Sequence, residues 1–119
     1  MIITLCGSTR FKDLFFTVAK ELTLAGNIVL MPMVFHHTDN DELTEEQKIR
    51  LDNLHKLKIN MSDAIYVINY GGYIGKSTYG EIDWASKLNK QIFFLESAEQ
   101  TPAKKEAETK EETEEWESI

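Results

Sequence analysis

The chain has 119 residues, 42% of them hydrophobic, and a formal net charge of −7 at pH 7. This length predicts one domain with a single core, and no apolar run approaches the roughly 20 residues of a membrane span. Residues 96–119 hold nine glutamates and three lysines, so residues 1–95 carry a net charge of only −1. A chain with no basic stripe is a poor binder of nucleic acid, and we expect neither nucleic acid nor a membrane as its partner.

The first predicted element is a strand at residues 2–6, which ends at the only cysteine of the chain. This apolar start is too short for a secretion signal and has no basic residues before it, so we expect a cytoplasmic protein. A single cysteine rules out an intrachain disulfide, which suits a reducing compartment. Because Cys6 closes an apolar strand, it is more typical of a core residue than of a nucleophile.

A turn, a helix and a second strand follow. The turn at 7–10 leads into a helix at 11–25, which Gly26 stops, and the strand lies at 28–33. The sequence of the turn, Gly-Ser-Thr-Arg, fits two interpretations. It is either an anion-binding loop or an ordinary helix start with an exposed arginine.

The polar loop at 35–43 contains His36, His37 and Asp39, a set of residue types found in metal sites. Two adjacent side chains in a loop rarely both reach one ion, and the chain lacks the Cys/His spacing of a metal centre. We therefore expect no metal and no other cofactor.

The second half of the chain repeats the alternation of helix and strand. Residues 44–47 fit a capping box that opens a helix running to about residue 60. A strand at 64–69, a helix at 77–88 and a strand at 91–95 follow. The residues expected on the inner face of the helix after the capping box are Leu51, Leu54, Leu57 and Met61.

Short apolar strands separated by amphipathic helices predict an α/β fold with a parallel sheet of four or five strands. In such sheets the ligand lies beyond the carboxyl ends of the strands. With the strand order 2-1-3-4(-5), the turn at 7–10 and the loop at 69–77 meet across one crevice. The glycines of that loop let backbone N–H groups approach a ligand, and the start of the next helix favours an anion. We therefore expect a ligand site at this edge.

Glu81 lies about one turn into the helix that follows the glycine-rich loop. A carboxylate at this place would project toward whatever the loop binds. The segment from Thr78 to Glu81 also fits a T-x-x-E capping box, in which Glu81 only bonds the start of its helix. The residues alone leave both interpretations open.

Two short motifs resemble the nucleoside 2-deoxyribosyltransferase superfamily, which includes the 2′-deoxynucleoside 5′-monophosphate N-hydrolases. They are Cys6-Gly7-Ser8-Thr9-Arg10 after the first strand and Ser77-Thr78-Tyr79-Gly80-Glu81-Ile82 at the third helix. The order of the elements is similar over roughly residues 1–95. The resemblance implies a flavodoxin-like (Rossmann-like) three-layer fold and a homo-oligomer, dimeric or larger. It also implies cleavage or exchange of the N-glycosidic bond of a small-molecule nucleoside or nucleotide.

The resemblance also implies roles for individual residues. Glu81 stands at the position of the family nucleophile, and the first-strand loop would contact the sugar or its 5′-phosphate. The substrate-binding residues that we expect are Gly7, Ser8, Thr9, Arg10, Gly71, Gly72, Tyr73, Gly75, Ser77 and Thr78.

The chain departs from the family at His55. The family has an aspartate there, eight residues before the aspartate that corresponds to Asp63. His55 is either a proton donor for the departing base, since free histidine titrates near neutral pH, or a partly buried helix residue. Asp52, one turn away, can share its face, so the catalytic candidates are Glu81, His55 and Asp52. The departure favours an alternative function, a non-catalytic module that binds or senses a nucleotide or an ADP-ribose-like ligand.

The C-terminal segment has a different composition from the rest. Between Ala103 and Trp116 the only hydrophobic residue is Ala107. Such a segment cannot bury enough surface to offset the entropy lost on ordering. We therefore divide the chain into an α/β domain at 1–97 and an acidic tail at 98–119, either disordered or a peripheral helix.

Overall fold

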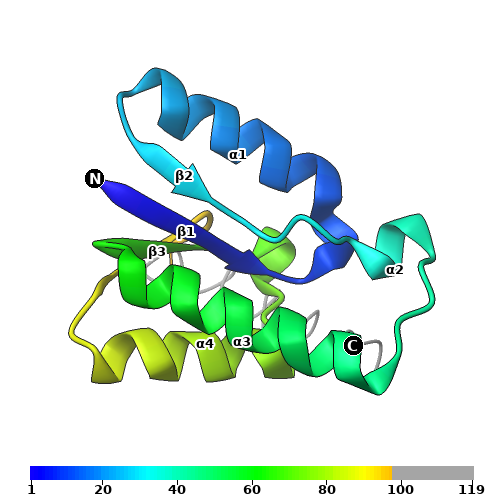
Figure 1. Ribbon diagram of the computed structural model, residues 1–119. Coiled ribbons are helices and arrows are strands. Elements are labelled where there is room, and N and C mark those ends of the chain that lie inside the picture. Colours follow the sequence, from blue (N-terminus) through cyan, green and yellow to red (C-terminus); the bar gives the residue numbers. More distant parts are fainter. Residues whose placement is uncertain (98–119) are drawn as a thin grey trace.

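The computed structural model describes residues 1–97 of the chain (Figure 1). Four parallel strands form one sheet: β1 (Ile2–Gly7), β2 (Ile28–Leu30), β3 (Ala64–Ile68) and β4 (Gln91–Phe94). Their order is β2-β1-β3-β4, which confirms the predicted α/β class and the order of a flavodoxin-like sheet. The predicted acidic tail lies outside the described residues.

Three long helices cover the two faces of the sheet (Figure 1). Helix α1 (Lys12–Leu24) packs on one face through Phe15 and Val18. Helices α3 (Glu45–Met61) and α4 (Lys76–Lys87) pack on the other face. Within the described part of the chain, none of these helices has the length and apolar character needed to cross a membrane.

The core has two parts because successive side chains of a strand point to opposite faces of the sheet. Ile3 and Leu5 of β1 are buried together with Phe15 of α1. Cys6, on the opposite face of the same strand, is buried together with Ile59 of α3. Both faces of the central strands β1 and β3 are covered, which explains why their sequences are almost continuously apolar rather than alternating.

The carboxyl ends of β1 and β3 lie side by side. Gly7 stands in register with Ile68, so the loops that follow these two strands leave the sheet at neighbouring points. Each loop contains a short 3-10 helix, η1 (Thr9–Phe11) and η2 (Tyr70–Gly72) respectively. The two unusual loops therefore converge, as the strand order predicts.

The segment after β2 differs from the prediction. The strand was expected to reach residue 33 but ends at Leu30. Pro32, two residues later, has no N–H to donate to a strand ladder. The expected loop at 35–43 contains a short helix, α2 (His36–Asp39), held by N–H bonds from its residues to the Phe35 carbonyl.

Helix α3 begins as predicted but faces the sheet with a different side. The Thr44 and Gln47 side chains make both hydrogen bonds of the capping box. The expected inner face was wrong, because Leu54, Leu57 and Met61 are 46%, 54% and 66% exposed.

The buried residues of α3 are His55 and Ile59 instead. Just beyond the helix, the Ser62 hydroxyl lies 2.6 Å from the Thr4 hydroxyl of β1 and is also buried. The inner side of the helix therefore contacts β1 through polar side chains as well as through the aliphatic Ile59. The side of α3 that holds most of its leucines is therefore not the side that faces the sheet.

Candidate active site

A cavity of about 340 Å³ lies at the carboxyl edge of the sheet. It is bounded by the end of β1, the segment after β2, one side of α3 and the start of α4. The residues predicted for the site that line it are Gly7, Ser8, Thr9, Asp52, His55, Ser77, Thr78 and Glu81.

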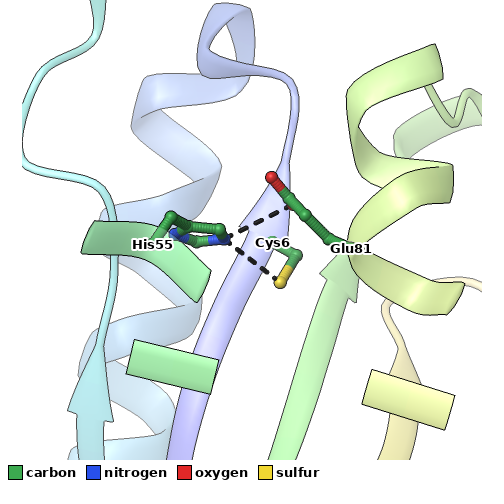
Figure 2. Close-up of side chains that lie close together, drawn as sticks. All are labelled: Cys6, His55 and Glu81. Carbon is green, nitrogen blue, oxygen red and sulfur yellow. Dashed lines mark hydrogen bonds and ion pairs between the residues drawn. The ribbon is translucent and has the colours of Figure 1, made fainter. Parts of the chain in front are cut away.

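Glu81 lies in a cluster with His55 and Cys6, in which His55 contacts each of the other two (Figure 2). Its Oε1 lies 3.4 Å from Nε2 of His55, and the same ring nitrogen lies 3.4 Å from Sγ of Cys6. The His55 and Glu81 side chains are only 10% and 16% exposed, and Cys6 is completely buried behind them. The three residues come from α3, α4 and β1, so only the tertiary fold brings them together.

Two polar atoms of this cluster lack a hydrogen-bond partner among the described residues. They are Nδ1 of His55 and Oε1 of Glu81, and both are buried. A buried polar group without a partner costs about 1–3 kcal/mol. A bound ligand that makes hydrogen bonds to these two atoms would explain why they have no partner within residues 1–97.

Cys6 is part of the site although it was expected only in the core. Its complete burial confirms the expected core position. Burial raises the pKa of the Cys6 thiol well above its ordinary value, and the neighbouring Glu81 carboxylate raises it further. The thiol is therefore protonated and unreactive at neutral pH.

The capping-box interpretation of Glu81 is wrong. Helix α4 begins at Lys76 with Gly75 as its N-cap, so Thr78 is already the third helical residue. Glu81 lies in the second turn, where it satisfies no N–H group of the helix start. Its side chain is directed at His55 instead (Figure 2).

The turn after β1 approaches the rest of the sheet closely. Gly7 has a φ of +152°, and a Cβ atom there would lie 2.9 Å from the Ile68 carbonyl oxygen. Only glycine fits this position without a shift of the backbone. Ser8 follows as N-cap of η1, where its hydroxyl accepts a hydrogen bond from the Arg10 N–H.

The remaining predicted residues lie outside the cavity lining: Arg10, Gly71, Gly72, Tyr73 and Gly75. The Arg10 guanidinium lies over the Tyr73 ring, 4.9 Å from its centroid. The Gly71 N–H donates to a carboxylate oxygen of Glu96 at 2.8 Å. An internal carboxylate thus occupies the place that a ligand was expected to take at this glycine.

The segment after β2 forms one wall of the cavity, which the sequence did not predict. His36 and His37 line it. The Thr9 hydroxyl lies 2.6 Å from Nδ1 of His37, and the Thr38 hydroxyl donates to the Thr9 carbonyl. Burial, followed by the nearby charges of His36 and Arg10, lowers the pKa of His37. The rule that ligands bind at the carboxyl ends of strands, applied to β2 as well, would have found this segment.

Two lysines of α3 were also missed. Lys48 and Lys58 line the cavity together with Leu51 and His55. Residues 48, 51, 55 and 58 are spaced three and four apart, so they share one face of a helix. Lys58 donates to the Met31 carbonyl at 2.9 Å, whereas the ion pair of Lys48 within residues 1–97 is a long contact of 3.9 Å with Glu45.

Neither a protein-family model nor a curated protein gives a significant match to the chain. The function is therefore inferred from the cavity, from the cluster of Cys6, His55 and Glu81, and from the two motifs that bound the cavity.

Proposed function

We propose that the protein cleaves or exchanges the N-glycosidic bond of a nucleoside or nucleoside 5′-monophosphate, with Glu81 as the nucleophile. One observation carries this proposal: a mostly buried carboxylate, one oxygen of which accepts no hydrogen bond from a described residue, lines the same cavity as the turn after β1. The resemblance of both motifs to the nucleoside 2-deoxyribosyltransferase superfamily supports it, because both motifs border this cavity. The volume lies at the lower end of the range typical of small-ligand pockets, about 300–1,000 Å³.

A carboxylate placed beside the anomeric carbon of a sugar can cleave the glycosidic bond in two steps. Glu81 would attack the anomeric carbon while the C–N bond breaks and its electron pair stays with the base. The resulting glycosyl ester is then opened by water, which gives hydrolysis, or by a second base, which gives exchange. Two displacements at one carbon retain the configuration, as in retaining glycosidases.

His55 would supply the proton that the departing base needs. Its ring stands beside Glu81 at the wall of the cavity, and its side chain is shielded from bulk water. A departing purine or pyrimidine anion is a poor leaving group, so protonation accelerates the step. Histidine can donate a proton near neutral pH.

Binding without turnover is the second candidate. The contact between Glu81 and the His55 ring favours it, because an imidazole stands where the family has a carboxylate. In that case the cavity would hold a nucleotide or ADP-ribose-like ligand as a sensor or sequestering site. The homo-oligomer implied by the family resemblance remains a prediction under either function.

Incubation with a panel of nucleosides and 5′-monophosphates tests the proposal. Chromatographic detection of free base, with and without a second base as acceptor, separates hydrolysis from exchange. Ligand binding measured by calorimetry without base release would support the sensor instead. Absence of both binding and release across the panel would refute both functions.

A further inference from the structure

Three side chains of different chemistry converge at the cavity wall (Figure 2). The Sγ of Cys6, the imidazole nitrogen of His55 and a carboxylate oxygen of Glu81 all lie within 4.8 Å of one another. These are the sulfur, nitrogen and oxygen donors that bind transition-metal ions in proteins.

Two of the three donor separations match those around a tetrahedral ion. Zinc binds sulfur at about 2.3 Å and nitrogen or oxygen at about 2.0–2.2 Å, so neighbouring donors around it lie roughly 3.3–3.6 Å apart. Two of the three separations, from His55 Nε2 to Cys6 Sγ and to Glu81 Oε1, are 3.4 Å, and all three donor atoms lie within 4.8 Å of one another. An ion fits between these atoms once the Cys6 and Glu81 side chains close around it.

The hydrogen bonding of the cluster is incomplete without such an ion. Oε1 of Glu81 is buried and accepts no hydrogen bond from a described residue, although it faces Nε2 of His55. A cation would satisfy this oxygen, and it would take the place of the contact between Nε2 of His55 and Sγ of Cys6.

We propose that Cys6, His55 and Glu81 bind one thiophilic divalent transition-metal ion, such as Zn²⁺, and that this ion blocks the site. The ion would enter from the cavity, which His55 and Glu81 line. Its fourth position would face the cavity and hold a water molecule. On binding, the Cys6 thiol loses its proton to solvent and Sγ becomes a thiolate ligand.

Metal binding itself does not depend on the proposed function, whereas inhibition rests on it. An ion held by Glu81 takes the oxygen lone pair that would attack the sugar. It also takes the His55 nitrogen that faces the nucleophile.

Spectroscopic titration of the full 119-residue chain with Co²⁺ tests the site directly. A thiolate bound to Co²⁺ gives a charge-transfer band in the near ultraviolet, and tetrahedral coordination gives strong visible d–d bands. Because the chain has one cysteine, a thiolate band can arise only from Cys6. We expect both bands to saturate at one ion per chain and to disappear when Zn²⁺ is added. Absence of the thiolate band in the wild-type protein overturns the proposal whatever the variants do.

Variants assign the other two ligands. His55→Ala and Glu81→Gln should each weaken Co²⁺ binding by at least about tenfold, because each removes one of three protein donors. The matched control is His36→Ala combined with His37→Ala, which removes the other two histidines of the chain and leaves the three proposed ligands in place. This control should keep the thiolate band and the affinity. Unchanged affinity in both ligand variants, or loss of the band in the control, overturns the assignment.

An activity assay separates inhibition from the proposed function. We expect Zn²⁺ at saturating concentration to suppress base release, and a chelator to restore it. If base release persists while Co²⁺ and Zn²⁺ occupy the site, the inhibition is refuted. If the metal binds but no substrate is ever cleaved, the metal site stands and the proposed function fails.

Discussion

Nε2 of His55 lies 3.4 Å from Oε1 of Glu81, and this contact joins α3 to α4 beside Cys6 of β1. In the family that the motifs resemble, a second carboxylate occupies the position of His55. Two adjacent carboxylates repel one another when both are ionised, whereas an imidazole beside a carboxylate does not. The substitution therefore changes the charge of the pair and keeps a group that can transfer a proton.

We expect Glu81→Gln to reduce base release by at least about a thousandfold, because the amide is not a nucleophile. The free energy of unfolding should change by less than about 1 kcal/mol, since Glu81 caps no helix. Asp83→Asn is the matched control, because Asp83 is an exposed carboxylate on the same helix, paired with Lys87 at 3.0 Å. Equal activity of the Gln variant and the control in a chromatographic assay would refute the assignment of Glu81.

The role of His55 is tested with two leaving groups. His55→Gln should slow the release of an ordinary purine much more than that of a purine already methylated at N7. The methylated base carries a positive charge and leaves without protonation, so it does not need a general acid. Steady-state rates with both nucleosides measure the difference. A uniform loss on both substrates would indicate that His55 only supports the structure of the site.

Phosphate recognition should depend on Lys48 more than on Arg10. Lys48 lines the cavity, whereas the guanidinium of Arg10 lies over the Tyr73 ring outside the lining. We expect Lys48→Ala to raise KM for a 5′-monophosphate about three- to tenfold more than KM for the matching nucleoside, through loss of a partly screened charged contact. Arg10→Ala should affect both substrates alike. A selective effect of Arg10→Ala on the monophosphate would reverse this assignment.

Two glycines should respond in opposite directions to alanine. Gly7→Ala places a Cβ 2.9 Å from the Ile68 carbonyl oxygen at a positive φ, and we expect a loss of about 2–4 kcal/mol of stability. A Cβ at Gly80, inside α4, meets no atom within 4 Å. Gly80→Ala should therefore stabilise the protein by about 0.5–1 kcal/mol. Urea unfolding measures both changes, and a neutral Gly7→Ala would show that the turn after β1 adapts easily.

The raised pKa of Cys6 predicts a slow reaction with thiol reagents. A raised pKa lowers the thiolate fraction at any given pH, so the native protein at pH 8 should react at least about tenfold more slowly than the unfolded chain. Glu81→Gln removes one cause of the raised pKa and should increase the native rate, although burial, the larger cause, remains. An aromatic disulfide reagent follows the reaction by absorbance. Rapid labelling of the native wild-type protein would contradict the buried, protonated thiol.

Much of the fold could be predicted from the sequence because its signals are local. The apolar runs of β1 and β3 and the capping box at Thr44 each depend on a few neighbouring residues. Strand order then follows from the rules of parallel sheets, and the order places the turn after β1 beside the loop after β3. The glycine-rich loop places Glu81 at this edge, whereas His55 is a candidate only because it stands where the resembled family has an aspartate.

The tertiary structure alone decided which side of α3 faces the sheet and what each loop residue contacts. Helical periodicity identifies residues that share a face, but the neighbours of that face are set by distant parts of the chain. This explains why Leu54 and Leu57 are exposed while His55 is buried against Cys6. In the same way, the Gly71 N–H is taken by Glu96, a residue 25 positions later in the sequence, which no local pattern reveals.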